Sequence, residues 1–273
     1  MERDHTMTST DTLISFTPAP LEELQLEHVP RLAPPASAPA TFAAWSAPQS
    51  VGAEQFRRLA VELSHTRARR PLAKVLVTSA APGEGKSVSA ANLALTLARP
   101  GRQRVLLLEG DLHRPTLLSR MGVRHDGGLA DWLEQRRTLP ECLARWSGLP
   151  LWVLPAGRSA GLPLELLQAC SPASILRLLE PQFDWIVIDS PPLLPMADAA
   201  HWARAADGVL LVARANHSRL SDLQRGVRQL EREKWLGVIL NDYQAREHHY
   251  YDQYYPGSGQ PGLAPVRQGT RKK

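Results

Sequence analysis

Residues 74–87, KVLVTSAAPGEGKS, combine the residue types and spacing of a phosphate-binding loop. Residues 75–77 suit a strand, the Pro-Gly and Gly-Lys steps interrupt it, and apolar residues recur at helical spacing over 87–98. Glycines let backbone N–H groups converge on one point, and the N-terminus of the following helix adds positive potential there. The predicted nucleotide-binding residues are Pro82, Gly83, Glu84, Gly85, Lys86, Ser87 and Val88.

Two side chains would complete the site. Lys86 would reach the β- and γ-phosphates, and the Ser87 hydroxyl would ligate Mg²⁺. The strict pattern begins with glycine where this chain has Ala80, but the four intervening residues before Gly85 are kept. The alternative is a glycine turn before an ordinary helix. The order of strand, loop, Lys-Ser and helix favours the phosphate loop, with ATP and Mg²⁺ as the expected ligands.

Two further apolar runs end in acidic residues. VLLL is followed by Glu109, Gly110 and Asp111, and WIVI is followed by Asp189. A carboxylate at the carboxyl end of a buried strand delivers negative charge beside the phosphate loop, where it can hold Mg²⁺ or its waters. We therefore predict that Asp111 and Asp189 join Ser87 around the metal, and that Glu109 supports them. The alternative is that these acids only cap the following helices.

The rest of the chain predicts an α/β fold. Strands are expected at 74–79, 104–109, 151–154, 184–189, 208–213 and 236–241. Helices are expected at 53–70, 87–99, around 115–121, 128–146, 163–180, 197–205 and 219–233. Strands that alternate with helices form right-handed crossovers, so we predict a P-loop NTPase fold with a mainly parallel sheet covered by helices on both faces.

Composition divides the 273 residues into three parts. Residues 1–50 are rich in Pro, Ala, Thr and Ser, which predicts a flexible arm. Residues 51–241 form the expected catalytic domain, and residues 242–273 a flexible, tyrosine-rich and basic tail. The two cysteines have neither a metal-binding spacing nor a disulfide framework, which suits a reducing cytosol. The net charge of +5 comes largely from the last residues, and we interpret that tail as solvated.

All five tyrosines fall within residues 243–255. Four of them lie in the polar stretch HHYYDQYYP, which cannot be a core strand. A sticky tail or an aromatic patch that docks on a partner would explain the cluster. Beside an ATP site, however, a tail dense in phenols is typical of a phosphoacceptor. The predicted acceptors are Tyr250, Tyr251, Tyr254 and Tyr255.

From about Glu54 to Tyr255 the chain resembles the bacterial tyrosine kinases that control capsule and exopolysaccharide synthesis, of the cytoplasmic autokinase type. SAAPGEGKS is similar to the phosphate loop of that family, VLLLEGDLHRP to its second motif and FDWIVIDSPP to its third. The resemblance implies MgATP-dependent autophosphorylation of the tail, largely between subunits of a homo-oligomer. In that reaction Lys86, Glu109, Asp111 and Asp189 would be catalytic, with Asp111 orienting or deprotonating the tyrosine hydroxyl.

The resemblance also implies partners and a place in the cell. These are the cytoplasmic segment of a membrane polysaccharide co-polymerase, which would activate the kinase, and a cognate tyrosine phosphatase, with no role for nucleic acid. The chain would be cytoplasmic and recruited to the inner face of the membrane by its partner.

Three positions depart from the family pattern. Glu109 stands where Asp is usual, His113 where Arg is usual, and Ala60 at the third place of an oligomerisation motif whose first two places, Glu54 and Arg57, match.

Two other functions remain open on the sequence. A partitioning or positioning switch ATPase of the ParA/MinD type shares the fold, although such proteins carry a lysine at the place of Ala81 and lack a tyrosine-rich tail. A non-catalytic nucleotide-binding scaffold would explain Glu109 and His113.

Overall fold

The computed structural model describes residues 26–99 and 103–243. Within them, eight strands form one sheet in the order β1-β4-β5-β3-β6-β2-β7-β8. All neighbours run parallel except β4 and β5, which are antiparallel. The strands are β1 (Arg31–Leu32), β2 (Lys74–Ser79), β3 (Val105–Glu109), β4 (Ala144–Trp146), β5 (Leu151–Leu154), β6 (Trp185–Asp189), β7 (Gly208–Arg214) and β8 (Trp235–Asn241).

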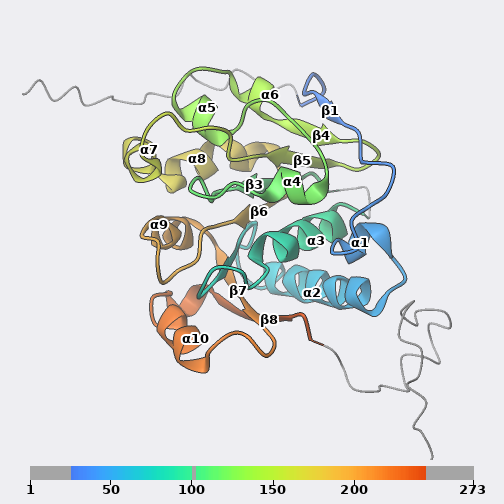
Figure 1. Ribbon diagram of the computed structural model, residues 1–273, viewed down its shortest axis with the longest axis vertical. Coiled ribbons are helices and arrows are strands. Elements are labelled where there is room, and N and C mark those ends of the chain that lie inside the picture. The colour runs from blue at the N-terminus through green and yellow to red at the C-terminus, as the bar shows by residue number, and fades with distance from the viewer. Residues whose placement is uncertain (1–25, 100–102, 244–273) are drawn as a thin grey trace, which may run out of the picture.

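Helices cover both faces of this sheet, which confirms the predicted fold class (Figure 1). They are α1 (Ala43–Ser46), α2 (Val51–Arg67), α3 (Lys86–Ala98), α4 (Leu117–Met121), α5 (Leu129–Leu133), α6 (Leu139–Cys142), α7 (Pro163–Ala169), α8 (Pro172–Leu179), α9 (Asp198–Ala205) and α10 (Leu220–Val227). Helices α1 to α4 pack on one face, and α5 to α9 on the other, where α10 adjoins α9.

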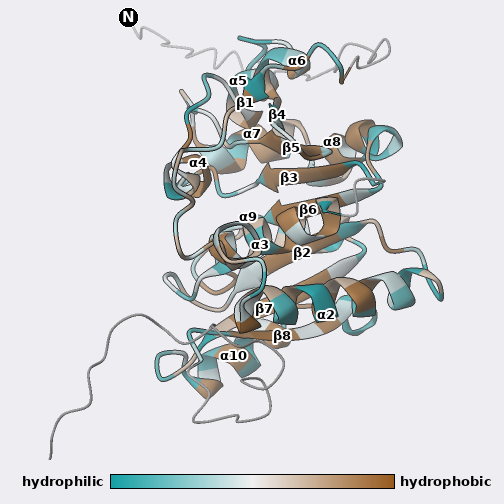
Figure 2. Ribbon diagram, turned by 90° about the vertical axis from the view of Figure 1, so that its right-hand side faces the viewer, coloured by the Kyte–Doolittle hydropathy of each residue, from teal (hydrophilic) through white to brown (hydrophobic). Residues whose placement is uncertain are grey.

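The central strands are apolar throughout because both of their faces are covered. Every residue of β3 and β6 is buried, and these strands are brown in Figure 2. Successive residues alternate between the two cores: Val75 and Val77 face α2 and α3, whereas Leu76 faces the α8 and α9 side. The carboxyl ends of β2, β3 and β6, which are neighbours in the sheet, carry the predicted site.

All six predicted strands are present, but two of the predicted helices are broken. The helix expected over 128–146 consists instead of α5, α6 and the strand β4, because Thr138 and Glu141 form a capping box that starts α6 anew. The helix expected over 163–180 divides into α7 and α8 at Ser171. The Ser171 hydroxyl accepts a hydrogen bond from the Ser174 N–H (3.2 Å) and caps α8.

The expected flexible arm is wrong for residues 26–50, and residues 1–25 lie outside the described residues. Phe42 is fully buried, and Asn92 of α3 forms hydrogen bonds with the residues on either side of Phe42. The Ala44 N–H donates to Asn92 Oδ1 (3.0 Å), and Asn92 Nδ2 donates to the Thr41 carbonyl (3.0 Å). A few apolar residues among Pro and Ala therefore suffice to anchor this segment, because α3 supplies polar partners for its backbone.

Two smaller expectations concern the thiols and the membrane. Cys142 and Cys170 are free and buried, and burial raises the pKa of both thiols to about 11, which makes them poor nucleophiles. Across the described part of the chain, every helix is too short or too polar to cross a bilayer.

Candidate active site

The loop between β2 and α3 has the backbone of a phosphate cradle. Gly83 (φ +82°) and Gly85 (φ +99°) both adopt left-handed conformations that favour glycine. Gly85 is also the N-cap of α3 and brings no side chain to the first N–H groups of the helix. Those groups stay available to an anion, and the helix dipole favours negative charge beside them.

Lys86 lies between the two predicted aspartates. Its Nζ is 2.9 Å from Asp111 Oδ2 and 4.0 Å from Asp189 Oδ1. All three side chains are largely buried. The sheet brings them together because β6 lies between β2 and β3, with Asp189 opposite Val77 on one side and Glu109 on the other. A cation therefore already balances the acidic groups at this edge of the sheet.

Asp189 is the most unusual of these groups. It is 1% exposed, and neither carboxylate oxygen has a hydrogen-bond partner among the described residues. Burial raises its pKa to about 7, although the charge of Lys86 acts in the opposite direction. Ser87, also buried, is the first residue after Lys86 in α3. Two buried carboxylate oxygens that accept no well-formed hydrogen bond, with Lys86 Nζ 4.0 Å from one of them, fit a hard cation such as Mg²⁺, which prefers oxygen ligands.

Glu109 has a different role from the one expected. Its Oε1 accepts hydrogen bonds from the N–H groups of Thr116 and Leu117 (both 2.7 Å), and its Oε2 accepts one from Ala156 (3.0 Å). Burial raises its pKa, while the three backbone donors oppose the shift. We therefore assign Glu109 to holding the start of α4 and the end of β5 beside the site, rather than to the metal.

Helix α9 supports the loop that follows β3. His113 Nε2 lies 2.7 Å from Oδ2 of Asp198, the first residue of α9, so a paired imidazole occupies the place where the family usually has arginine. Trp202, fully buried, lies against Gly110, where an added Cβ would be 2.8 Å from the indole. No spacing in the sequence indicated the contact of Trp202 with Gly110.

The phosphate loop is also held from the other side. Glu84 is buried, its Oε2 accepts a hydrogen bond from the Ala81 N–H (2.9 Å), and its Oε1 contacts the Ser218 hydroxyl. Asn241, at the end of β8, donates from Nδ2 to the Glu84 carbonyl (3.1 Å). Ser218 and Asn241 were not among the predicted residues, because they lie more than a hundred residues away along the chain.

The predicted acceptor tyrosines 250, 251, 254 and 255 lie outside the described residues, so their role stays a prediction. Tyr243 is described and is 62% exposed, directly after the end of β8. The described residues therefore end at the same end of the sheet that carries the phosphate loop.

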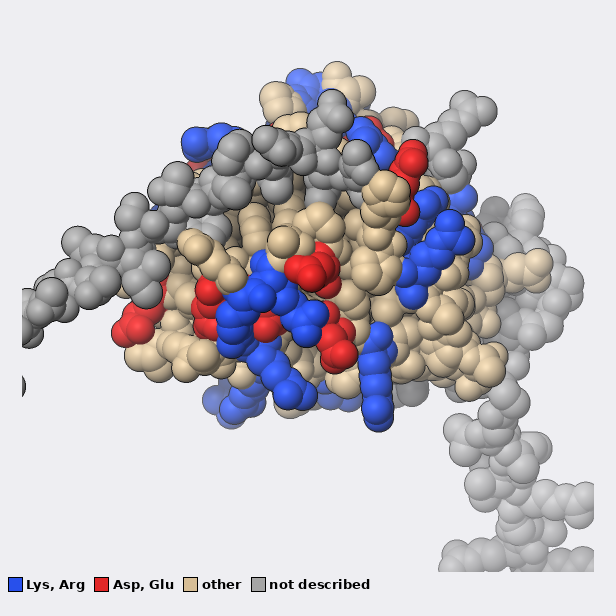
Figure 3. All heavy atoms as spheres, turned by 90° about the horizontal axis from the view of Figure 1, so that it is seen from above, with Lys and Arg blue, Asp and Glu red and all other residues tan. Residues whose placement is uncertain are grey.

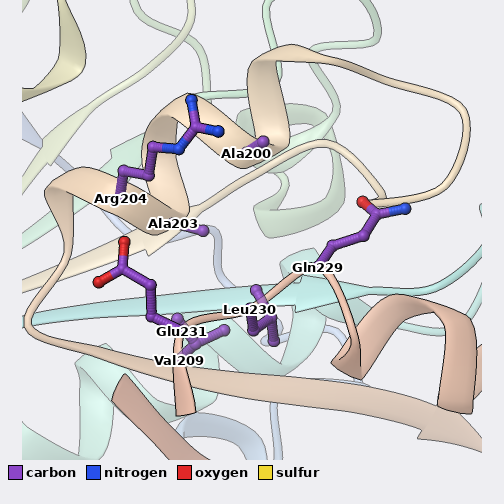
Figure 4. A pocket seen from close by; sticks show the side chains of 7 residues that line it. All are labelled: Ala200, Ala203, Arg204, Val209, Gln229, Leu230 and Glu231. Carbon is purple, nitrogen blue, oxygen red and sulfur yellow. The ribbon is translucent and has the colours of Figure 1, made fainter. Parts of the chain in front are cut away.

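Two other surface features stand apart from this site. A cavity of about 210 Å³ lies between α9, β7 and the segment after α10, with an apolar floor and the polar side chains of Arg204, Gln229 and Glu231 around it (Figure 4). On the face seen in Figure 3, around α5 and α6, basic and acidic side chains are interspersed. None of the residues that line the cavity is a predicted site residue.

Comparison with known proteins identifies the family to which this fold and site belong. Residues 75–267 match the family model described as CbiA, the CobQ/CobB/MinD/ParA nucleotide binding domain. The chain is 30% identical over 213 residues to "Tyrosine-protein kinase YwqD" of Bacillus subtilis (strain 168), covering 77% of this chain and 90% of that protein. It is 32% identical over 228 residues to "Succinoglycan biosynthesis transport protein ExoP" of Rhizobium meliloti (strain 1021), covering 77% of this chain and 29% of ExoP.

Among solved structures, the "chimerical protein CapA2B2" superposes with a TM-score of 0.70 at 25% identity, over 80% of this chain and 96% of that one. The match to YwqD spans nearly the whole of that kinase. The chain therefore belongs to the bacterial tyrosine-protein kinases, and its nucleotide-binding domain is of the CobQ/CobB/MinD/ParA type.

Proposed function

We propose that the protein transfers the γ-phosphoryl group of MgATP to tyrosines of its own tail, in the manner of a non-specific protein-tyrosine kinase, and thereby regulates exopolysaccharide or capsule synthesis and export. The observation that carries this proposal is the buried group of Lys86, Asp111 and Asp189 beside the phosphate loop. Phosphoryl transfer requires mainly positioning and charge neutralisation, and this group supplies both.

Each residue has a distinct part. Backbone N–H groups of residues 83–87 would hold the phosphates, with Pro82 at the start of the loop and Val88 in the first turn of α3. Lys86 would turn from Asp111 to the β- and γ-phosphate oxygens, and this exchange of partners would release Asp111 Oδ2. The freed carboxylate can then orient the tyrosine hydroxyl or accept its proton, which is useful because a free phenol has a pKa near 10.

The metal would be held by Ser87 and Asp189, with Asp111 nearby through water. When bound, Mg²⁺ supplies positive charge against the charge that develops on the transferred group. The buried carboxylate of Asp189 supports this assignment, because its nearest cation, Lys86 Nζ, is 4.0 Å away and neither oxygen accepts a well-formed hydrogen bond from the described residues, which leaves both oxygens open to a metal ligand.

The names of the relatives support the proposed partners. ExoP is named as a transport protein, and the match covers only 29% of it, so in that protein the kinase-like region belongs to a longer chain. We propose that the present chain works with a separate membrane co-polymerase, whose cytoplasmic segment recruits it to the inner membrane face and activates it. A cognate tyrosine phosphatase would reverse the modification, and a homo-oligomer would bring one tail to a neighbouring site.

A truncation tests the reaction. A chain ending at Asp242 lacks every tyrosine but keeps Lys86, Asp111 and Asp189. It should show no phosphotyrosine on itself, yet it should label a full-length Lys86→Ala protein when the two are mixed with radiolabelled MgATP. Each protein incubated alone is the control. Absence of label on the Lys86→Ala chain would contradict transfer between subunits, and label on the truncated chain would contradict tyrosine as the acceptor.

Activation by the partner needs a separate measurement. A peptide from the cytoplasmic segment of the cognate co-polymerase, added in excess to the full chain, should raise the rate of autophosphorylation, whereas a scrambled peptide should not. An unchanged rate would contradict the proposed partner.

A further inference from the structure

The end of β8 makes a contact with the phosphate loop that concerns the shape of the nucleotide site itself. Asn241 Nδ2 donates to the Glu84 carbonyl oxygen at 3.1 Å. The same amide fills the space beside Gly85, where an added Cβ would lie 2.0 Å from Nδ2. Gly85 thus leaves room for Asn241 in addition to adopting its left-handed conformation.

This contact fixes the orientation of one peptide plane. All the described peptide bonds are trans, and in a planar trans peptide the carbonyl and the N–H point in opposite directions. Because Asn241 holds the Glu84 carbonyl, the N–H of Gly85 must point away from β8. Gly85 directly precedes Lys86, and its N–H is one of the donors proposed above for the phosphates.

A second contact holds the same residue from its side chain. The buried Glu84 carboxylate accepts the Ala81 N–H with one oxygen, which closes the loop on itself, and contacts the Ser218 hydroxyl with the other. Ser218 in turn accepts a hydrogen bond from the Arg214 N–H (2.7 Å) at the end of β7. The phosphate loop is therefore held at Glu84 by both of the strands that complete this edge of the sheet.

The chain that leads to the tail belongs to the same arrangement. The Ala215 N–H donates to the Asn241 carbonyl (2.9 Å), and the Arg214 guanidinium pairs with Asp242 (2.9 Å). Tyr243 follows at once. The point at which the tail leaves the domain is thus one residue beyond the side chain that holds the phosphate loop.

We propose that Asn241 is a positioning residue for nucleotide binding: its amide sets the Glu84–Gly85 peptide so that the Gly85 N–H faces the phosphates. This inference rests on the nucleotide site proposed above. The hydrogen bond from Asn241 orients a donor to the phosphate groups and not to the base. Its loss should therefore weaken the binding of every ligand with a diphosphate to the same extent. Asp111 follows β3 and Asp189 ends β6, away from β8, so the transfer step itself should depend on Asn241 much less than nucleotide binding does.

The test compares two ligands and three variants of the full chain. Asn241→Leu keeps the branched shape of the side chain but removes the donor, and Asn241→Ala removes both. Leu240→Ala is the matched control, because Leu240 is 53% exposed and neighbouring side chains of a strand point to opposite faces. Dissociation constants for ADP and for inorganic pyrophosphate, both with Mg²⁺, are measured by calorimetry well below the unfolding temperature of each variant.

Both Asn241 variants should bind ADP and pyrophosphate about three- to tenfold more weakly than the wild type, as expected for the loss of one hydrogen bond. Leu240→Ala should bind both like the wild type. In the kinase assay, the Asn241 variants should show a raised KM for ATP with kcat within about twofold, since a purely structural defect would lower kcat as well.

Three results would overturn the inference. These are unchanged affinity in Asn241→Leu, weaker binding of ADP but not of pyrophosphate, and an equal loss in Leu240→Ala. A Lys86→Ala chain separates this failure from failure of the nucleotide site: if it binds ADP as tightly as the wild type, the proposed function itself is wrong. The chain ending at Asp242 keeps Asn241 and should bind ADP normally.

Discussion

Replacing Asp189 by Asn should stabilise the nucleotide-free protein at alkaline pH. Burial raises the pKa of Asp189 from 3.8 to about 7 in the folded state. The folded protein therefore holds this proton over a range in which the unfolded chain has released it. Within that range the folded state binds more protons, so its stability decreases as the pH rises. Above pH 7 the full cost is present, and a shift of about three pKa units corresponds to roughly 4 kcal/mol.

Asn has the size of Asp but no charge, so the variant avoids this cost. We expect urea denaturation at pH 8 to show the variant more stable than the wild type by up to about 4 kcal/mol. The difference should shrink as the pH falls from 7 toward 3.8, the pKa of Asp189 in the unfolded chain, because below that pH Asp189 is protonated in both states. Comparing the two proteins at each pH cancels the titration of the groups that do not interact with Asp189, whereas its interactions with Lys86, Glu109 and Asp111 remain part of the measured difference.

Mg²⁺ and ADP should narrow the difference in stability between the two proteins. A ligand at a hundred times its Kd adds about 2.7 kcal/mol to the stability of a protein that binds it, and the variant, which lacks the proposed metal ligand, should gain less. A variant that is less stable than the wild type at pH 8 without nucleotide, or a difference that is the same at pH 8 and pH 5, would refute the reasoning.

Three further substitutions separate chemistry from structure. Lys86→Ala should lower tail phosphorylation on the order of a hundredfold, and it should also lower the urea midpoint, because Asp111 and Asp189 lose the buried cation between them; a rate near wild type in the folded variant would contradict the assigned site. Glu109→Gln should lower the free energy of unfolding by about 1–3 kcal/mol, because the glutamine NH₂ group would face a backbone N–H. The folded variant should still bind MgADP, and loss of that binding would indicate that Glu109 contributes to the metal site. Gly110→Ala should lower the free energy of unfolding by about 1–3 kcal/mol, since the methyl group would overlap Trp202; an unchanged stability in the same urea assay would contradict the close contact.

The sequence predicts the strands well because buried parallel strands have a simple signature. β2 and β5 have the predicted bounds. Each of the other four strands, β3, β6, β7 and β8, differs from its predicted range by one residue at one end. The short strand β4 could not be found in this way. Its three residues, ARW, have no periodicity of their own, and they form a strand only because β5 and β1 offer edges to pair with.

The sequence indicated which residues form the site better than it indicated which contacts those residues make. Lys86, Asp111 and Asp189 follow from a loop and two strand ends, which the sheet must bring to one edge. Glu109 occupies an equivalent place in its strand, yet its carboxylate is taken by backbone donors from Thr116 and Ala156. Which way a strand-end carboxylate turns depends on loops that close from elsewhere in the chain, and no local pattern records them.

The N-terminal segment that covers α3 has a consequence for how the chain is made. β1 is the first strand to be synthesised, but its partner β4 follows more than a hundred residues later, and Phe42 has no pocket until α3 exists. Contacts so distant in sequence form late, because the intervening chain must first be ordered. The growing chain therefore exposes an aromatic side chain at its leading end until the body of the domain has folded. Closing this segment over α3 is then a late event of folding, and only at that point does the Asn92 side chain gain its hydrogen bonds to Ala44 and Thr41.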